Sequence, residues 1–302
     1  MSDPIEGLLL VDKPAGPTSH DVVDRVRRLS GERRVGHAGT LDPAATGLLP
    51  VAIGRATRLV RFLPGSPKAY EGTLRLGIST TTDDLEGEPL ARHAGAPPPA
   101  EEVLRAASGF RGRMSQTPPD VSARRVGGER MYRLARRGAK VEAPPSEIEI
   151  FRFELSPAED DATWRFVAEV SSGTYVRALA RDLGAALGCG AAVASLRRTA
   201  IGPLRVESAL PLAALDASGR EGLARAVVPP ARMPFEAPAV SLETEAACAR
   251  FRSGAAVAFP RGAQDGGTVA VFSPAGDLVG MGAVSGTALR PLVVLPPRAA
   301  RR

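Results

Sequence analysis

Residues 36–58 read GHAGTLDPAATGLLPVAIGRATR and hold a single carboxylate, Asp42, among glycine, alanine, threonine and aliphatic residues. The second half of the stretch, GLLPVAIG (47–54), is a short apolar run bounded by glycines. Such a run predicts a buried strand, which we expect Pro50 to interrupt because proline has no amide hydrogen. Asp42 itself is followed by proline, and Asp-Pro commonly initiates a turn. Local pattern alone therefore makes Asp42 a turn residue that leads into a core strand.

Outward from this stretch, strand and helix patterns follow one another without a regular βαβ rhythm. Apolar runs or period-two alternation predict strands at residues 7–14, 69–78, 147–155 and 163–170. Helical spacing predicts helices over residues 101–108 and 174–188, and between a Thr18 or Ser19 cap and Gly31. This mixture predicts an α+β sheet protein rather than a doubly wound nucleotide-binding fold.

A proline-rich segment, PPARMPFEAPAV (229–240), separates this region from the carboxyl end of the chain. Beyond it, three short strand-like runs, TVAVFS, LVGMGAV and LRPLVVL, are separated by turns that contain glycine. Short strands at this spacing predict a small β-barrel or sandwich. We therefore expect two domains, residues 1–232 and residues 238–302.

Positive charge is concentrated in one part of the chain. The formal net charge is +6 and the isoelectric point is near 10.0. Residues 111–140 hold nine basic residues, eight of them arginines, against two acidic ones. A solvated helix face is the alternative, but such faces usually alternate signs. We expect a surface that contacts the phosphate backbone of a nucleic acid.

Several classes of protein are disfavoured by what the sequence lacks. No run approaches the roughly 18 apolar residues of a membrane helix, and we expect no signal peptide. Cys189 and Cys248 lie far apart, and the three histidines form no pair at metal-ligand spacing, so we expect free thiols in a reducing cytosol and no transition metal. No phosphate-binding loop motif is present. Asp83 and Asp84 could hold Mg²⁺, but TDDLEG is a good turn sequence, which we favour.

Four blocks of the sequence, taken together, carry a family resemblance. Residues 36–58 resemble the signature of the bacterial tRNA pseudouridine-55 synthases, the TruB family. LLLVDKPAGPTSHDVV (8–23) resembles the family's KPxGxTSxxVV segment, and YEGTLRLGISTTTDD (70–84) resembles its YEGxxxLGxxTDTDD segment. Residues 171–203 are similar to its GTYIRxLxxDLGxxLGxGAxxxxLRRxxxG block. The carboxy-terminal module is similar to the PUA-like barrel that ends many members.

The resemblance implies a fold, an activity and a partner. It implies a mixed, largely antiparallel sheet with flanking helices over residues 1–232, a basic RNA-clamping insertion at about residues 111–146, and a PUA-like RNA-binding domain over residues 238–302. The implied reaction is isomerisation of the T-loop uridine at position 55 of tRNA to pseudouridine, by base flipping and an essential aspartate. We expect no cofactor, no metal, no membrane association, a monomer and a cytoplasmic location.

The lone carboxylate agrees with this chemistry. Pseudouridine is an isomer of uridine, so the reaction needs no redox partner and one ionised carboxylate suffices. Glycoside hydrolysis normally uses two carboxyl groups, one to activate water and one to protonate the leaving group. Asp42 without a second nearby acid thus favours isomerisation. Whether it attacks C1′, attacks C6 of the base or assists a glycal route stays open.

The resemblance assigns roles residue by residue. Asp42 matches the catalytic aspartate, Arg177 the arginine that holds it ionised and oriented, and Tyr70 the tyrosine that stacks on the base and takes the C5 proton. Further substrate contacts are expected from Tyr175 and Leu196 in the uracil pocket, His37 at the RNA loop, and Arg125 at a phosphate. Lys13 is a candidate substrate contact, with a surface or turn lysine as the equal alternative.

The sequence departs from the family pattern at two places and leaves two other functions open. Val121 stands where the family has an aromatic residue, so that contact is lost, and Thr81 replaces one acid of the TDTDD segment. These changes affect the expected grip on RNA rather than the reaction. An RNA-folding chaperone without chemistry and an RNA glycosidase are the alternatives.

Overall fold

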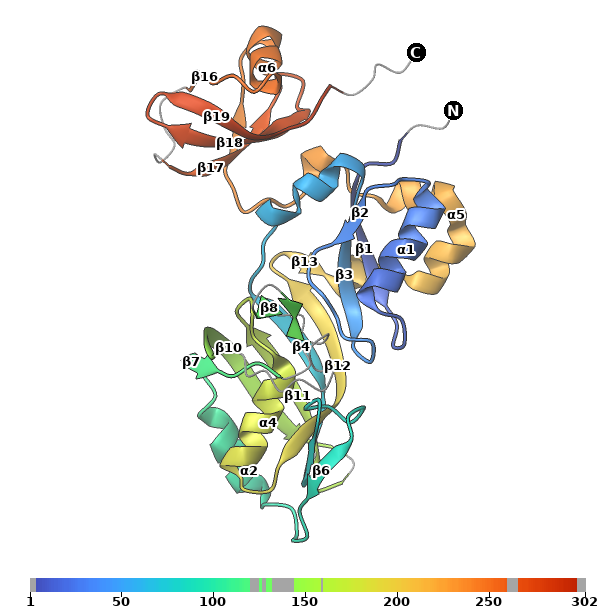
Figure 1. Cartoon of the computed structure of the whole chain (residues 1–302), viewed down its shortest axis with the longest axis vertical. Coiled ribbons are helices and arrows are strands. Elements are labelled where there is room, and N and C mark those ends of the chain that lie inside the picture. Colours follow the sequence, from blue (N-terminus) through green and yellow to red (C-terminus); the bar gives the residue numbers. More distant parts are fainter. Residues whose placement is uncertain are drawn as a thin grey trace.

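The computed structural model describes residues 4–119, 125–126, 129–131, 144–158, 160–259 and 266–297. Their main features are two sheets that follow one another along the long axis of an elongated molecule (Figure 1). The larger sheet occupies the middle and lower parts of Figure 1, and the smaller one lies at the top. No helix in these ranges is long and apolar enough to span a membrane.

The larger sheet contains ten strands among the described residues and is mixed but mostly antiparallel. In spatial order its main path is β14 (Leu210–Pro211), β1 (Gly7–Lys13), β3 (Thr46–Ile53), β12 (Ala191–Ile201), β4 (Lys68–Leu76), β11 (Thr163–Val170), β10 (Ser146–Pro157) and β7 (Gly112–Gln116). Two short strands pair beside this path, β2 (Val35–His37) with β3 and β13 (Leu204–Arg205) with β12. The predicted α+β class with a mixed, largely antiparallel sheet is confirmed.

Helix α1 (Ser19–Ser30) covers the β1–β3 half of the sheet, together with α5 (Leu212–Ala226) (Figure 1). It begins as predicted, because the Thr18 hydroxyl accepts from the Asp21 amide while the Asp21 carboxylate accepts from the Thr18 amide, a capping box. It ends at Gly31, whose φ of 69° is a left-handed conformation that favours glycine. For strand β3, by contrast, the expectation that Pro50 interrupts it is wrong.

Strand β3 runs unbroken through Pro50. The Pro50 carbonyl accepts from the amide of Ala38, just past the end of β2, so the nitrogen of Pro50 faces the same side. No ladder hydrogen bond to β1 is lost there, because both polar groups of a strand residue point toward one neighbour.

The other half of the larger sheet is covered by α2 (Ala100–Ser108) and α4 (Val176–Ala186). Tyr70, Leu74 and Leu76 alternate along β4 and enter this core, as their period of two predicts. Strands β10 and β11 pair antiparallel, also as predicted. Strand β12 was not predicted, although it joins the two halves by pairing with β3 through Arg197 and Arg198 and with β4 along most of its length.

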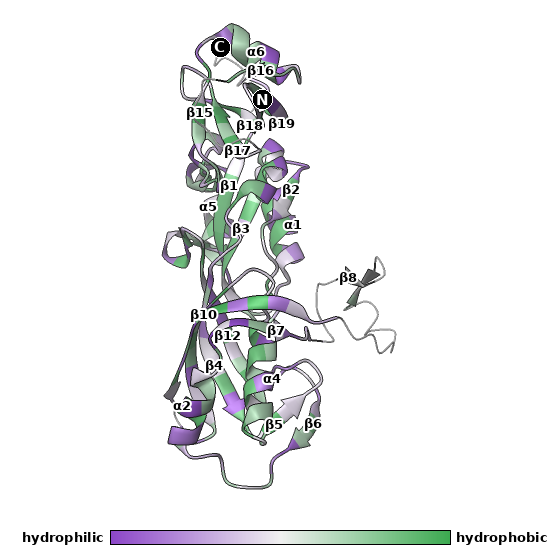
Figure 2. Cartoon of the chain, turned by 90° about the vertical axis from the view of Figure 1, so that its left-hand side faces the viewer, coloured by the Kyte–Doolittle hydropathy of each residue, from purple (hydrophilic) through white to green (hydrophobic). Residues whose placement is uncertain are grey.

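The smaller sheet has the order β15 (Ala239–Ser241), β17 (Thr268–Phe272), β18 (Leu278–Ser285), β19 (Ala288–Val294) and β16 (Val257–Ala258), with α6 (Glu245–Arg252) beside it. The three predicted carboxy-terminal strands are β17, β18 and β19. One apolar cluster joins this sheet to the larger one, since it includes Met281 and Leu278 together with Leu8, Leu48 and Leu59. Figure 2 shows these apolar strands in series along the long axis.

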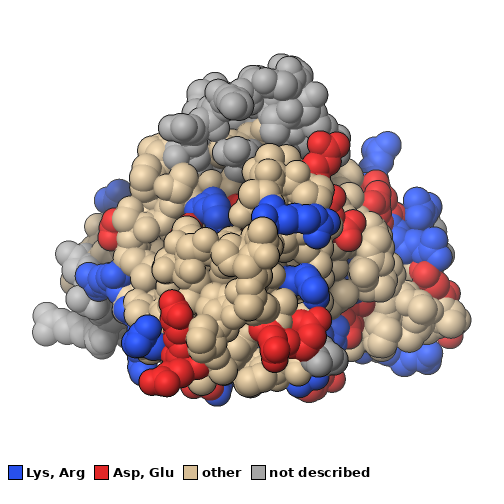
Figure 3. All heavy atoms as spheres, turned by 90° about the horizontal axis from the view of Figure 1, so that it is seen from below, with Lys and Arg blue, Asp and Glu red and all other residues tan. Residues whose placement is uncertain are grey.

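The remaining short elements connect these layers. They are the 3₁₀ turns at Gly54–Arg58, Val60–Phe62, Val206–Ser208 and Pro230–Arg232, the hairpin of β5 (Ile78–Thr80) with β6 (Pro89–Arg92), and β8 (Arg125–Val126) paired with β9 (Glu129–Arg130). Most of the basic segment expected to clamp RNA, residues 111–146, lies outside the described residues. Seen from below, acidic and basic side chains of the described residues lie side by side (Figure 3).

Candidate active site

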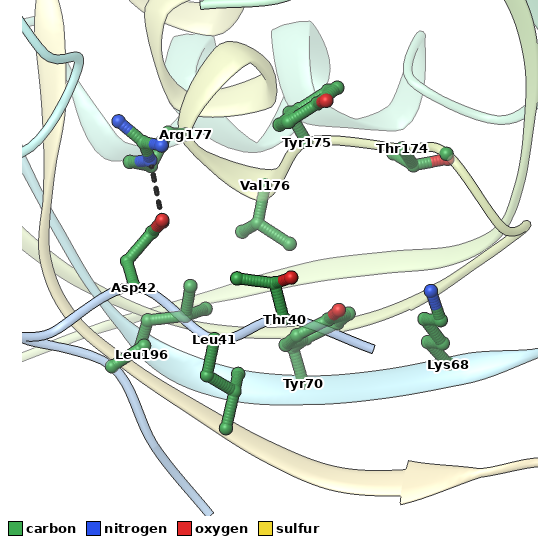
Figure 4. Close-up of a pocket in the computed structure, with 12 residues that line it drawn as sticks. Thr40, Leu41, Asp42, Lys68, Tyr70, Thr174, Tyr175, Val176, Arg177 and Leu196 are labelled. Atoms are coloured by element: carbon green, nitrogen blue, oxygen red, sulfur yellow. Dashed lines mark ion pairs between the residues drawn. The ribbon is translucent and has the colours of Figure 1, made fainter. Parts of the chain in front are cut away.

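A cavity of about 180 Å³ lies where α4 faces the strands β4 and β12. Figure 4 shows side chains converging on it from the loop before β3, from strands β4 and β12, and from the start of α4. Its lining residues are Thr40, Leu41, Asp42, Ala45, Lys68, Tyr70, Gly173, Thr174, Tyr175, Val176, Arg177 and Leu196. The structure thus brings together five of the eight residues predicted for the site, Asp42, Tyr70, Tyr175, Arg177 and Leu196.

Asp42 stands in the loop between β2 and β3, and its backbone is held on both sides. Leu41, buried in the core, donates its amide to the Ser19 hydroxyl at 2.9 Å, and its carbonyl accepts from the same hydroxyl at 3.0 Å. The Asp42 carbonyl accepts from the amide of Ala45 at 3.1 Å, which closes the predicted turn. The Asp42 side chain is half-exposed, at 42%, and points toward α4 (Figure 4).

Arg177 reaches this carboxylate from the first turn of α4. Its Nε lies 3.0 Å from Oδ2 of Asp42, and its side chain is only 7% exposed. The same guanidinium lies 3.5 Å from the Asp84 carboxylate and donates to the Thr82 carbonyl at 2.6 Å. A planar guanidinium held at several points is rigid, so it fixes the direction in which the Asp42 carboxylate faces the cavity.

The floor of the cavity is formed by two paired strands. Tyr70, on β4, is 8% exposed. Leu196, on β12, pairs with Gly72, which follows Tyr70 by two residues on β4. Gly72 is required there because a Cβ atom would lie 2.0 Å from the carbonyl oxygen of Ser195. This close approach brings Leu196 and Tyr70 to one surface, on which a flat ring can rest.

Tyr175 closes the cavity on the opposite side, at the N-cap of α4. Its amide donates to the side-chain oxygen of Gln116 at 2.9 Å, and its carbonyl accepts from the Gln116 amide nitrogen at 3.1 Å. Gln116 is itself 2% exposed, so both of its polar atoms are used inside the protein. This two-way bond from β7 fixes where α4 begins and therefore where Arg177 lies.

Lys68 lines the same cavity and was missed by sequence reasoning. It precedes Tyr70 by two residues on β4, so it lies on the same face of the strand, a signal that could have found it. Among the described residues its ammonium group makes no hydrogen bond or ion pair, and Figure 4 shows it at the end of the cavity away from Asp42. Burial, and next the charge of Arg198, lower the pKa of Lys68.

Lys13 does not reach the surface on which substrate would lie. Its side chain is 0% exposed, and its Nζ donates to the carbonyls of Pro14, Pro17 and Pro43 at 2.9, 2.8 and 3.0 Å. All three ammonium hydrogens are therefore used inside the protein. Burial lowers the pKa of Lys13 to about 8, against the opposing charges of Asp42 and Asp21. In this arrangement the buried side chain of Lys13 links β1 to Pro43, the residue after Asp42. The sequence had suggested either a substrate contact or a surface or turn lysine.

The other two predicted contacts lie outside the cavity. His37 ends β2, five residues before Asp42, and does not line the cavity. Arg125 lies in the short strand β8, and its side chain is outside the described residues.

Asp83 and Asp84, considered above for Mg²⁺, are engaged by arginines. Asp83 lies 3.1 Å from Arg181 and Asp84 lies 3.5 Å from Arg177. Within the described ranges, no three histidine, cysteine or acidic side chains are grouped as metal ligands. The link from Asp84 to Arg177 was not foreseen, because TDDLEG was interpreted as a turn, with a Mg²⁺ site as the alternative.

Comparison with known proteins gives a consistent family. The family model described as "TruB family pseudouridylate synthase (N terminal domain)" matches residues 27–176, and "tRNA pseudouridylate synthase B C-terminal domain" matches residues 177–233. The first match contains Asp42 and Tyr70, and the second contains Arg177 and Leu196.

Relatives and solved structures extend this likeness over nearly the whole chain. The tRNA pseudouridine synthase B of Gloeobacter violaceus is 46% identical over 97% of this chain and 99% of its own length. That of an Arthrobacter species is 41% identical over 97% of both. One chain in a crystal structure of a Cbf5-Nop10-Gar1 complex matches with a TM-score of 0.73 and 27% identity, over 97% of this chain and 85% of its own.

Proposed function

The chain belongs to the TruB family of pseudouridine synthases and is a tRNA pseudouridine synthase, an isomerase, and we propose that its target is the T-loop uridine at position 55. We further propose that the uridine is flipped out of its stack into the cavity beside Asp42. The observation that carries the proposal is the buried guanidinium of Arg177, 3.0 Å from Asp42, the one carboxylate among the described residues that line this cavity.

The proposed reaction is balanced without any other reactant. The bond between C1′ and N1 breaks, the uracil turns, a bond forms between C1′ and C5, the proton leaves C5, and N1 gains a proton. Asp42 is the proposed catalytic group, whether it attacks C1′ or C6 or assists a glycal route. Tyr70, on the floor of the cavity, is the proposed acceptor of the C5 proton.

The detached base must be held while it turns. Tyr70 and Leu196 lie on one side of the cavity and Tyr175 with Val176 on the other, so a flat ring is enclosed between them (Figure 4). Removing a base from its stack costs a few kcal/mol, which contacts to the rest of the RNA must offset. The exposed position of Asp42 at 42% leaves the sugar room to approach.

Contacts to the RNA backbone are assigned to cations around the cavity. Lys68, which has no ion partner among the described residues, is placed to bind a phosphate next to the target uridine. His37, Arg125 and the basic segment 111–146 are the proposed contacts to the T-arm stem-loop. We assign residues 1–232 to the catalytic unit and 238–302 to a PUA-like RNA-binding domain, in a cytoplasmic monomer that uses no cofactor.

The test is to map pseudouridine in a T-arm stem-loop after incubation with purified protein and no added metal or cofactor. The proposal expects modification of the uridine at position 55 and of no other uridine. Release of free uracil would indicate a glycosidase, and tight binding without product would indicate a chaperone. Modification only at another tRNA position would contradict the assigned target.

A further inference from the structure

Arg198 makes an unusual set of contacts next to the proposed catalytic loop. It is 1% exposed, and among the described residues its guanidinium donates only to backbone carbonyls: Nε to Leu48 at 2.9 Å, Nη1 to Thr40 at 3.2 Å and Nη2 to Gly39 at 2.9 Å. Two of these three carbonyls belong to residues two and three positions before Asp42. One side chain therefore joins the start of the loop to the strand that follows it.

The position of Arg198 in β12 makes these contacts possible. It pairs with Gly47 of β3 on one side and with Tyr70 of β4 on the other. Gly47 has a φ of +98°, and a Cβ atom there would lie 2.2 Å from the Arg198 carbonyl oxygen. Glycine at this point lets β12 approach β3 closely, so Arg198 stands between the loop that carries Asp42 and the strand that carries Tyr70.

Arg198 differs from its neighbour Arg197 in that no carboxylate among the described residues pairs with its charge. Arg197 pairs with both oxygens of the Asp12 carboxylate at 2.9 and 2.7 Å and lies away from the cavity. Arg198 forms no ion pair within the described part of the chain. A buried charge without a counter-ion is weak support for stability, because its desolvation is balanced only by carbonyl dipoles. The presence of a buried arginine here is better explained by the geometry that its three donor nitrogens impose on the backbone of the loop and of β3.

We propose that Arg198 is a positioning residue that holds the carbonyls of Gly39 and Thr40 so that the Asp42 carboxylate meets Arg177 and the sugar of the substrate. This inference rests on the proposed role of Asp42. It assigns Arg198 no contact with substrate, since Arg198 does not line the cavity. Two cations thus hold the loop, Arg198 before Asp42 and Lys13 after it. Lys13 donates to the Pro43 carbonyl at 3.0 Å.

The experiment compares Arg198→Lys with Arg197→Lys, which changes the adjacent residue in the same way. Lysine keeps the charge but offers its donors from one nitrogen, so it cannot span three carbonyls. For Arg198→Lys we expect kcat on T-arm RNA to fall about 100-fold, as for a displacement of roughly 1 Å, with KM and RNA affinity within a few-fold of wild type. Amide hydrogen exchange should accelerate over residues 38–46 and stay unchanged in β4. Arg197→Lys should keep the wild-type kcat.

Three results would overturn the positioning role. These are a wild-type kcat for Arg198→Lys, a loss confined to KM, and global unfolding of both Arg198→Lys and Arg198→Met, since the proposed defect is local. Asp42→Asn, assayed in parallel, separates this inference from the proposed function. Turnover by Asp42→Asn refutes the catalytic aspartate itself, whereas an inactive Asp42→Asn beside a fully active Arg198→Lys refutes only the role of Arg198.

Discussion

At the scale of single residues, the site is a buried cation that orients a half-exposed carboxylate. Arg177 is 7% exposed and bridges Asp42 and Asp84, so its charge is balanced on both sides. Removing one partner of such a group leaves the other charges uncompensated and costs more than the pair itself contributes. The arginine and the aspartate are therefore expected to depend on each other.

Arg177→Lys should lower kcat for pseudouridine formation by on the order of 100-fold, because lysine cannot contact Asp42, Asp84 and the Thr82 carbonyl at once. RNA affinity should change little, as measured by filter binding. Arg181→Lys is the matched control, since Arg181 lies one turn later in α4, pairs with Asp83 and does not line the cavity. Equal activity of the two variants would refute the role of Arg177.

Lys68→Met should weaken binding of T-arm RNA, because one phosphate contact is lost. The slope of the logarithm of the association constant against the logarithm of salt concentration should fall by about one. Its lowered pKa shows that burial disfavours its charged form, so the same change should raise the free energy of unfolding at neutral pH. Arg75→Met, on the outer face of β4 where Arg75 pairs with Asp160, should do neither. An unchanged salt slope for Lys68→Met would contradict the phosphate contact.

At the scale of elements, the sequence was sufficient where a pattern is local. The capping box and Gly31 delimit α1, and alternation in β4, β10 and β11 shows which face is buried. Strand β12 was missed because Arg197 and Arg198 look like surface residues, whereas one bonds a carboxylate and the other backbone carbonyls. Helix α5 was missed as well, since Gly219, with φ of 60°, breaks its helical spacing.

The candidate site shows the same division between local and distant information. Asp42, Tyr70 and Arg177 could be named because each lies in a motif of the family, but no spacing tells that Asp84 contacts Arg177. The burial of Lys13 follows from how β1 ends against the loop after Asp42, which depends on the pairing of β1 with β3. Contacts of this kind are set by sheet order and cannot be derived from one segment.

Lys13, which links β1 to the loop after Asp42, gives a prediction about the pH dependence of stability. The pKa of Lys13 is lowered by burial to about 8 in the folded protein, against 10.5 for a free lysine, so between these values the unfolded chain binds more protons. The free energy of unfolding of the wild type relative to Lys13→Met should therefore rise as pH increases from about 8 to 10.5 and be flat below pH 7. Urea titrations at several pH values measure this difference. A constant difference across that range would contradict the lowered pKa.

At the scale of the whole molecule, the two sheets are joined by one apolar cluster as well as by the chain. Met281 and Leu278 of the smaller sheet belong to the same buried apolar cluster as Leu8 and Leu48 of the larger one. A hydrogen bond from Arg58 to the Val294 carbonyl, 3.1 Å long, lies across the same junction. An RNA bound to both parts would thus meet surfaces with a fixed spacing.

Met281→Ala should lower the free energy of unfolding by about 2–5 kcal/mol, because Met281 is 0% exposed and its loss leaves a cavity at the junction. Urea unfolding followed by tryptophan fluorescence should report the loss, since Trp164 lies in the larger sheet. Leu292→Ala is the control, as Leu292 is 43% exposed. If the Trp164 signal keeps its wild-type midpoint, the two sheets do not unfold together.

The central claim is that Asp42 performs the chemistry in the cavity beside Arg177. The most direct measurement is single-turnover formation of pseudouridine at position 55 of T-arm RNA by Asp42→Asn, with saturating protein and RNA affinity determined on the same samples. Asp160→Asn, an exposed aspartate on the Arg75 side of the sheet, is the matched control. We predict no detectable pseudouridine with Asp42→Asn, RNA affinity within a few-fold of wild type, and full activity with Asp160→Asn. Substantial turnover by Asp42→Asn would contradict the account.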